Sequence, residues 1–265
     1  MKFVSSIVSY LKFLWHSTNQ HGVHSPFVFN LVTKCLYDRK NFPEYKQLTA
    51  YRKSLLANHH TIEVTDFGAG SRVFTSNTRT ISKIAKTAGI SPKRAELLFR
   101  ITRYFQPSTI LEIGTSLGLA TSALALGNPK AKINTLEGCP NTLATAKKIA
   151  ENSNFQIPNS NVEFVKTEFY SYLKNFELQT SNFQLIYFDG NHTQEATLDY
   201  FDLLLPTITN DSVWIFDDIH WSVDMEAAWE RIKNHPKVTV TIDTFQWGLV
   251  FFRTEQEKEH FTIRC

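Results

Sequence analysis

The stretch Ile110-Leu-Glu-Ile-Gly-Thr-Ser-Leu-Gly-Leu-Ala120 decides the fold of this 265-residue chain. A short apolar run leads into Gly114, and a run rich in Ala and Leu follows Gly118. Gly114 permits a tight turn because it has no Cβ, and Gly118 lets the next helix begin close to the strand and to any ligand across the turn. The stretch therefore predicts a strand, a glycine turn and a helix that cradle a nucleotide.

The spacing of the glycines narrows the kind of nucleotide. A dinucleotide fingerprint needs glycine at the first, third and sixth positions. Those positions are Gly114, Ser116 and Leu119, so two of the three fail. This disfavours an NAD-dependent oxidoreductase. What remains is Glu-x-Gly-x-x-x-Gly, with Glu112 placed two residues before the first glycine.

Strands and helices alternate downstream of this turn. Residues 131–137 form a second predicted strand that ends in Glu137, an acid placed to accept both ribose hydroxyls of an adenosyl ligand. Five more strands are predicted, over residues 161–166, 183–189, 212–217, 238–243 and 248–252. The pattern predicts a Rossmann-like α/β fold with a doubly wound, mostly parallel sheet of seven strands. The last two strands are predicted to be antiparallel, because only a few residues join them.

Composition is that of an ordinary globular protein. With 42% hydrophobic and 20% charged residues, the chain can bury one core and a small appended region. A net charge of +3 with no basic cluster does not indicate a nucleic-acid partner. Three widely spaced cysteines indicate neither a disulfide framework nor a zinc site, and a reducing cytoplasm fits: Cys35, Cys139 and Cys265.

The beginning of the chain does not follow the alternation. We predict an N-terminal helical extension over residues 1–92, acting as a cap or substrate region, and a sheet-forming domain over residues 93–265. Residues 1–15 carry a helical stripe of apolar side chains, Phe3, Ile7, Leu11 and Leu14. It predicts an amphipathic helix packed on the domain, with a membrane-surface anchor as the alternative. Stable membrane insertion and a signal peptide are not expected.

Two further stretches of the extension attract attention. His21–Phe27 predicts a turn and then a helix, with Ser25 as N-cap and Pro26 at the first helical position. Its two histidines are ordinary loop residues on one interpretation and metal ligands on the other. Asp66–Ser71 also resembles a glycine turn, but the small-residue helix that should follow is missing. It is predicted to be a loop over the mouth of the active site.

Carboxylates follow two of the predicted strands. Asp189-Gly-Asn-His192 ends the fourth strand, and Asp217 with Asp218 ends the fifth. Ligands of doubly wound sheets bind outside the carboxyl ends of the strands, so the three acids are predicted to converge. Close carboxylates repel one another, and oxygen ligands suit a divalent cation, for which magnesium is our choice.

An alternative stays open for these acids. Neighbouring residues of a strand point to opposite faces, so Asp217 and Asp218 can share one ion only if the chain turns there. Each acid, Asp189 included, can instead satisfy backbone donors in a turn.

The glycine turn with its preceding acid resembles motif I of the class I S-adenosylmethionine (SAM)-dependent methyltransferases. The resemblance covers roughly residues 93 to 253. It implies that Glu112 lies near the methionine moiety, that the turn packs under the cofactor and that Glu168 lies near the adenine amino group. The implied cofactor contacts are Glu112, Gly114, Ser116, Gly118, Glu137, Gly138 and Glu168.

The three acids resemble those of the divalent-cation-dependent O-methyltransferases of the catechol and macrolide-sugar type. There, an acid after strand four and an acidic pair after strand five hold the ion. The resemblance implies a metal site at Asp189, Asp217 and Asp218. A base lies three residues after the first acid, and His192 occupies that place. Capping of the helix that begins near Thr193 is the alternative role for this histidine.

The predicted function is methyl transfer from SAM to a hydroxyl of an unidentified small molecule, with divalent-metal assistance. His192, a residue that titrates near neutral pH, and Asp189 are the predicted catalytic residues. A metal-independent methyltransferase acting on nitrogen or nucleic acid is one alternative, although no Asn/Asp-Pro-Pro-Tyr/Phe motif follows the fourth strand. A non-catalytic binding protein of the same fold is another. No motif fixes the oligomeric state, and a homo-oligomer stays open.

Overall fold

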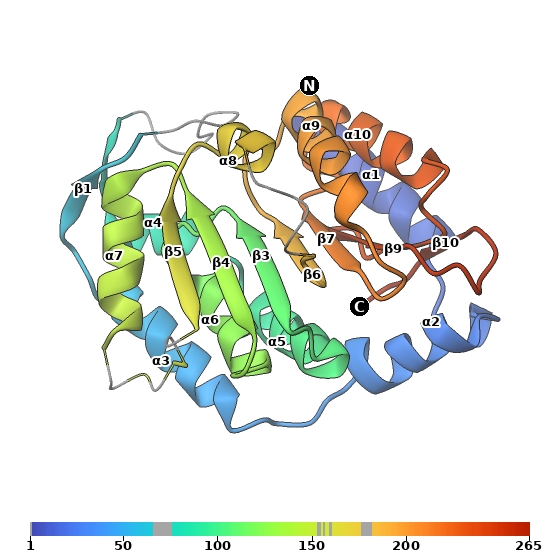
Figure 1. Cartoon of the computed structure of the whole chain (residues 1–265), viewed down its shortest axis with the longest axis horizontal. Coiled ribbons are helices and arrows are strands. Elements are labelled where there is room, and N and C mark those ends of the chain that lie inside the picture. Colours follow the sequence, from blue (N-terminus) through green and yellow to red (C-terminus); the bar gives the residue numbers. More distant parts are fainter. Residues whose placement is uncertain (1, 66–75, 153–154, 156, 159–160, 176–181) are drawn as a thin grey trace. The chain divides into compact units, whose positions relative to one another are not determined.

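The computed structural model describes residues 2–65, 76–152, 155, 157–158, 161–175 and 182–265 (Figure 1). They divide into two compact units, described separately below. The central unit comprises Asp38–Phe169, and the terminal unit joins Met1–Tyr37 to Tyr170–Cys265. Residues 1–92 contribute to both units, and the predicted division into an extension and a sheet-forming domain after residue 92 stays a prediction.

The central unit contains a three-stranded parallel sheet with β4 in the middle. A separate antiparallel pair, β1 with β2, precedes it along the chain. The elements in order are α3 (Glu44–Leu56), β1 (Thr61–Glu63), β2 (Thr78–Thr80), α4 (Ile81–Thr87), α5 (Pro92–Phe105), β3 (Thr109–Ile113), α6 (Leu119–Gly127), β4 (Lys132–Glu137), α7 (Pro140–Ala150) and β5 (Val162–Lys166).

Local sequence explains where helices of this unit begin. Ser91 caps α5 by accepting a hydrogen bond from the backbone N–H of Arg94 at 3.3 Å, and Pro92 occupies the first helical position. All nine residues of α6 are buried. A helix that is apolar on every side belongs inside the protein, which is why the Ala- and Leu-rich run after Gly118 enters the core.

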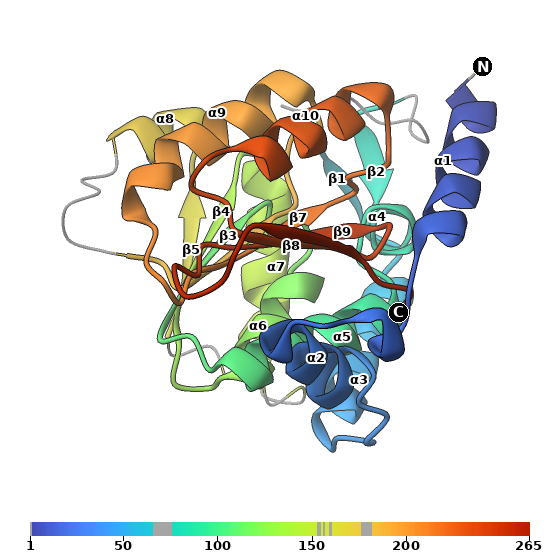
Figure 2. The ribbon, with the colours of Figure 1, turned by 90° about the vertical axis from the view of Figure 1, so that its right-hand side faces the viewer.

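The terminal unit contains five strands in the order β10-β8-β9-β7-β6. The pairs β6–β7 and β8–β10 are parallel, and β9 is antiparallel to both of its neighbours. Figure 2 shows α9 and α10 on one face of these strands and α2 on the other. The elements are α1 (Lys2–His16), η1 (Gln20–Gly22), α2 (Pro26–Leu31), η2 (Val32–Leu36), α8 (Phe169–Asn175), β6 (Leu185–Phe188), α9 (Gln194–Leu204), η4 (Leu205–Thr207), β7 (Val213–Asp217), α10 (Val223–Asn234), β8 (Val240–Asp243), β9 (Trp247–Phe251) and β10 (Glu259–Thr262).

The predicted α/β fold is confirmed, including the antiparallel closing pair β8 and β9. The described residues form eight strands in these two groups, where the sequence predicted seven. The additional strand is β10, which pairs in parallel with β8. Only Phe261 of its four residues is buried, so this short edge strand has no alternating apolar pattern by which to predict it.

The predicted N-terminal elements form with one difference. The helix after His21–Phe27 begins at Pro26, and the Ser25 hydroxyl accepts the N–H of Val28 at 3.3 Å. Helix α1 is present and packs on Phe245 through Tyr10 and Phe13, but Ile7 and Leu11 of the predicted apolar stripe are exposed. The loop Asp66–Ser71 lies outside the described residues.

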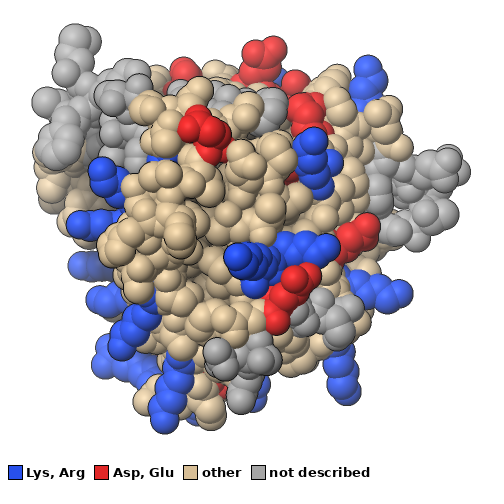
Figure 3. Space-filling model, turned by 90° about the vertical axis from the view of Figure 1, so that its left-hand side faces the viewer, with Lys and Arg blue, Asp and Glu red and all other residues tan. Residues whose placement is uncertain are grey.

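Two surface properties complete the description. Among the described residues, no helix has the length and apolar character needed to cross a membrane. Both signs of charge occur on the face that Figure 3 displays, in keeping with a formal net charge of only +3.

Candidate functional site

The glycine turn follows β3 in the central unit and is held by the end of β4. The backbone N–H groups of Gly114 and Thr115 both donate to the carbonyl of Leu136, at 3.0 and 2.9 Å. Gly114 has φ 105° and Gly118 has φ 76°, values that favour glycine. Ser116 also adopts a left-handed φ of 48°. The turn therefore requires glycine at both predicted positions.

Glu137, the predicted ribose contact, closes the turn from the last position of β4. One carboxylate oxygen accepts the N–H of Ser116 at 2.8 Å, and the other accepts the N–H of Cys139 at 2.9 Å. The side chain is half-buried, and each carboxylate oxygen can accept a second hydrogen bond. Glu137 is thus fixed in direction by two backbone amides. Its ligand role stays a prediction.

Glu112 lies on β3 and is fully buried. One carboxylate oxygen accepts the hydroxyls of Thr121 at 2.5 Å and Thr135 at 2.6 Å. The other oxygen, Oε1, has no hydrogen-bond partner among the described residues. Burial raises the pKa of this carboxyl to about 7, although the two threonine hydroxyls act in the opposite direction. A buried, unpartnered acceptor at this point fits a cationic donor such as the ammonium group of SAM.

Tyr51, on α3, supports the turn from beneath and was not singled out in the sequence. Its buried hydroxyl donates to the carbonyl of Leu117 at 2.9 Å. A Cβ added to Gly118 would lie 2.7 Å from the Tyr51 hydroxyl oxygen. No local pattern links these residues, because 66 positions separate Tyr51 from Leu117.

Two further predicted cofactor residues, Gly138 and Glu168, lie in the loops that follow β4 and β5. Gly138 is half-buried and directly follows β4. Glu168 is exposed, between β5 and α8, and its carbonyl accepts the hydroxyl of Thr167 at 3.1 Å. An adenine contact from Glu168 stays a prediction.

His192 and Asp189 come together in the terminal unit, in the turn after β6. The His192 Nε2 atom lies 3.7 Å from Asp189 Oδ1, and both side chains are partly exposed. The helix that follows is capped by Thr193, whose hydroxyl accepts the N–H of Ala196 at 3.3 Å. The alternative that His192 caps this helix is therefore wrong, and its imidazole is available for another role.

Asp217 and Asp218 end the neighbouring strand β7. Phe188 of β6 is paired with Phe216 of β7 in a parallel register, which brings Asp189 and Asp217 to the same level of the sheet. Asp218 has φ 54°, so the chain does turn at this residue. Asp217 is buried, and its carboxylate accepts the N–H of Asp218 at 2.9 Å.

The geometry of a metal site is not formed by these acids. Among the described residues, no group of three His, Cys, Asp or Glu side chains is arranged to hold a metal ion. The carboxylate of Asp217 is turned back onto the next backbone amide, which is the structural role that the sequence left open for it.

His220 is a further member of this region that the sequence did not identify. Its Nδ1 lies 2.9 Å from Glu226 Oε1 and its Nε2 lies 2.8 Å from Asp243 Oδ2. Burial lowers the pKa of His220, but the two carboxylates outweigh it and the pKa is raised. The ring stacks on Phe245, with centroids 5.1 Å apart. Both ring nitrogens are engaged, so His220 ties α10 and β8 to the turn after β7.

Trp221 completes the surroundings of His192. Its backbone N–H donates to the carbonyl of Asp218 at 2.9 Å, and its ring centroid lies 6.1 Å from that of His192. The ring is half-buried. An aromatic side chain thus borders the histidine and leaves part of its own face open to a ligand.

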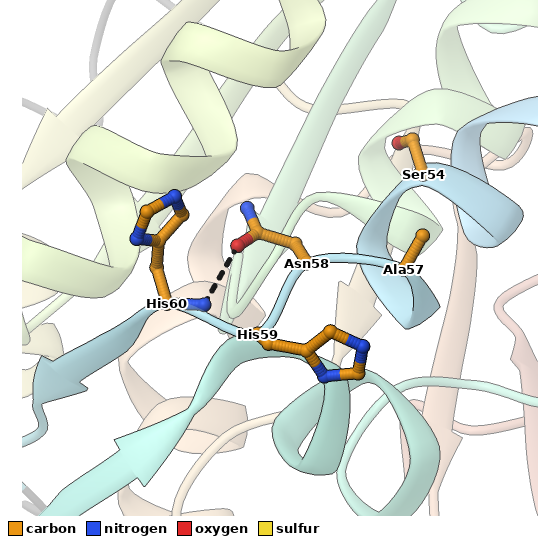
Figure 4. Close-up of a pocket in the computed structure, with 5 residues that line it drawn as sticks. All are labelled: Ser54, Ala57, Asn58, His59 and His60. Carbon is orange, nitrogen blue, oxygen red and sulfur yellow. Dashed lines mark hydrogen bonds between the residues drawn. The ribbon is translucent and has the colours of Figure 1, made fainter.

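A separate hollow opens where α3 leads into β1 in the central unit (Figure 4). Asn58 Oδ1 accepts the N–H of His60 at 3.0 Å, and the rings of His59 and His60 point away from each other. Two histidines that diverge cannot share an ion. The hollow is lined by Ser54, Ala57, Asn58, His59 and His60.

The fold and the glycine turn define a class of protein, the Rossmann-like α/β proteins. Residues 111–219 match the family model described as a methyltransferase domain. The resemblance to a methyltransferase that the sequence predicted is confirmed over these residues. No curated protein matches the sequence.

Solved structures share the fold. The SAH-bound methyltransferase PaMTH1 of Podospora anserina is 14% identical with a TM-score of 0.61, over 87% of this chain and 97% of that chain. An O-methyltransferase of Bacillus cereus in complex with SAH is 17% identical, with a TM-score of 0.55 over 81% and 92%. The O-methyltransferase TomG of Streptomyces achromogenes, in complex with SAM, is 14% identical with a TM-score of 0.56 over 86% and 95%. At these identities the likeness concerns the fold.

Proposed function

We propose that this protein is a SAM-dependent O-methyltransferase acting on a hydroxyl of a small molecule. The observation that carries the proposal is the glycine turn closed by Glu137, whose two oxygens hold the N–H groups of Ser116 and Cys139. This arrangement presents a fixed carboxylate beside two left-handed glycines, as an adenosyl ligand requires. Support comes from the matching domain model and from neighbours whose names include SAM or SAH.

The cofactor residues of the proposal all belong to the central unit. Glu137 would accept the ribose hydroxyls, and Glu112 Oε1 offers an unpartnered acceptor to the ammonium group. When bound, SAM supplies an electrophilic methyl group on a sulfonium. The protein's task is then to hold an oxygen nucleophile in line and to remove its proton.

Proton removal is assigned to His192. Asp189 lies 3.7 Å from its Nε2 atom, an ion-pair distance at which the carboxylate would stabilise the imidazolium formed after proton transfer. Thr193 already caps the following helix, so no structural duty of that kind competes for the imidazole. Trp221 would form an apolar wall for the acceptor.

Metal assistance is the finer part of the proposal. Its support is the position of two acids: Asp189 directly follows β6 and Asp217 ends the adjacent parallel strand β7, at the same level of the sheet. The chain also turns at Asp218. The described side chains do not yet form a ligand group, so we assign no reaction step to a cation. Activity that EDTA abolishes and magnesium restores would support this part, whereas full activity in EDTA would contradict it.

The first test is calorimetric titration of the whole chain with S-adenosylhomocysteine, with NAD as the control ligand. We expect binding of the homocysteine analogue and none of NAD. Transfer of labelled methyl from SAM to vicinal diols such as catechol tests the acceptor class. Failure to bind the analogue, with or without magnesium, would refute the proposal and favour a non-catalytic protein of this fold.

A pair of variants tests the assignment of Asp189. Asp189→Ala is expected to lose most turnover while S-adenosylhomocysteine still binds, because the cofactor residues lie elsewhere in the chain. Asp199→Ala removes an exposed carboxylate of α9 and serves as the matched control. Full turnover of Asp189→Ala would show that catalysis depends neither on the ion pair between Asp189 and His192 nor on a metal ion held by Asp189.

A further inference from the structure

Helix α1 exposes an apolar face to solvent. Ile7, Leu11 and Trp15 follow one another at four-residue spacing, and Val8 lies beside them. Their exposed fractions are 49%, 60%, 87% and 43%, in the order Ile7, Leu11, Trp15 and Val8. Contiguous exposed apolar side chains of this kind mark a surface where something binds. We call these four side chains the α1 face.

The helix is attached to the terminal unit by a different side. Phe13 is buried, and its ring centroid lies 5.4 Å from that of Phe245, while the ring of Tyr10 lies 4.9 Å from the same residue. With 3.6 residues per turn, Phe13 projects nearly opposite to Leu11. Helix α1 thus packs on the terminal unit through Tyr10 and Phe13, and the α1 face stays exposed. In Figure 2, α1 is the dark blue helix that ends at the label N.

The charges of α1 have a single sign. No Asp or Glu occurs between Lys2 and His16, and the helix carries Lys2, Lys12 and a terminal histidine. Lys12 is exposed and follows Val8 by four residues, so it borders the α1 face. A surface with negative charges beside an apolar layer is complementary to this arrangement.

A lipid bilayer with anionic headgroups has both properties. Amphipathic helices with basic residues and exposed Trp or Leu side chains lie in the plane of such an interface. Among the side chains of α1 that the structure describes, Trp15 is the most exposed apolar one, and tryptophan favours the boundary between headgroups and acyl chains. The 15 residues of α1 span about 22 Å, less than the roughly 30 Å of a bilayer's hydrocarbon core, so the helix would lie flat.

A second copy of the chain is the competing occupant. In a two-fold symmetric contact the α1 face would pack on itself, and Lys12 of each copy would border the same seam. No acid within α1 is available to neutralise these lysines. The charge pattern therefore favours an anionic surface over a self-association through this face.

We propose that α1 binds the surface of anionic bilayers, with Ile7, Leu11 and Trp15 inserted below the headgroups and Lys12 at the phosphate level. The proposal is independent of the methyltransferase activity proposed above. The α1 face consists of only four apolar side chains, so binding to the bilayer would be reversible and sensitive to salt.

Vesicle flotation of the full chain tests the proposal. We expect binding to vesicles of phosphatidylcholine with 30% phosphatidylglycerol, and weaker binding to pure phosphatidylcholine or in high salt. Leu11→Ser should lower the partition coefficient by about tenfold, the effect of losing one buried leucine side chain. Lys12→Glu should lower it as well and should weaken its salt dependence. Val223→Ser, at an exposed apolar position of α10, is the matched control and should bind like the unchanged chain.

A spectroscopic readout identifies the inserted residue. Brominated lipids should quench tryptophan fluorescence of the full chain, and Trp15→Phe should abolish most of this quenching while flotation persists, because Trp214, Trp229 and Trp247 are buried. Trp221 is half-buried, so Trp221→Phe is the matched control and should leave most of the quenching in place. Absence of flotation with anionic vesicles at low salt would overturn the proposal. So would a change of oligomeric state in Leu11→Ser, seen by light scattering, with vesicle binding unaltered. The latter result would assign the α1 face to a second copy.

Discussion

Replacing Glu112 by glutamine should change how the stability of the protein depends on pH. The carboxyl is fully buried on β3, and within the described part of the chain only one of its oxygens is hydrogen-bonded, to the hydroxyls of Thr121 and Thr135. Glutamine keeps the shape and an oxygen for these two donors but cannot ionise. The variant therefore isolates the contribution of one buried titrating group.

The magnitude follows from the pKa of Glu112, which burial raises from 4.5 to about 7. The folded protein holds this proton more tightly than the unfolded chain. The stability that the proton provides is therefore complete below pH 4.5 and is lost as the pH rises through 7. The full loss is about 3 kcal/mol, and about 2.5 kcal/mol of it falls between pH 5 and pH 8. Glu112→Gln should lack this loss.

Urea unfolding at pH 5, 6, 7 and 8 measures the effect. The difference in unfolding free energy between Glu112→Gln and the unchanged chain should move by about 2.5 kcal/mol in favour of the variant from pH 5 to pH 8. Glu163→Gln, at an exposed carboxylate of β5, is the control and should show no such trend. If the difference for Glu112→Gln were constant with pH, the carboxyl would not be titrating from a raised pKa and the reasoning would fail.

The glycine turn supports three further predictions. Gly118→Ala should lower the melting temperature and weaken S-adenosylhomocysteine about tenfold or more, because φ is 76° and the new Cβ meets the Tyr51 hydroxyl at 2.7 Å. The loss should be smaller in a Tyr51→Phe background, where that oxygen is absent, and strict additivity would contradict the steric account. Ser116→Gly should stabilise the chain by about 1 kcal/mol in thermal unfolding, since it relieves a left-handed φ of 48°. Glu137→Gln should weaken the binding of S-adenosylhomocysteine measured by calorimetry, because the glutamine NH₂ group would face the backbone N–H of Ser116 or of Cys139. Unchanged affinity would exclude Glu137 as a cofactor-binding residue.

Much of the architecture was predictable because its signals are local. Each of these signals depends on only a few neighbouring residues. Examples are the glycines of the turn, Gly114 and Gly118, and the helix-capping residues Ser25 and Ser91. Glu137 was predictable because it ends the second predicted strand, which the structure shows as β4. These features could be read from short windows of sequence, where steric freedom and hydrogen-bond capacity decide the conformation.

Relations between distant residues were not predictable in this way. Glu112 was identified as a cofactor residue, but its burial between two threonines depends on how α6 and β4 pack. Tyr51 and His220 find their partners many positions away, and no periodic pattern records such contacts. The three acids were predicted to converge, and this stays a prediction; the hydrogen bond from the Asp218 amide to Asp217 was not predictable, because it depends on the backbone turn at Asp218.

The sequence by itself determined the α/β class, the glycine turn and the amphipathic character of α1. Only the tertiary structure decided which side of α1 meets the protein, because helical periodicity defines an apolar face without saying what covers it. In the same way, the sequence named the acids, whereas packing and backbone direction decided whether each one faces a ligand, a hydroxyl or an amide.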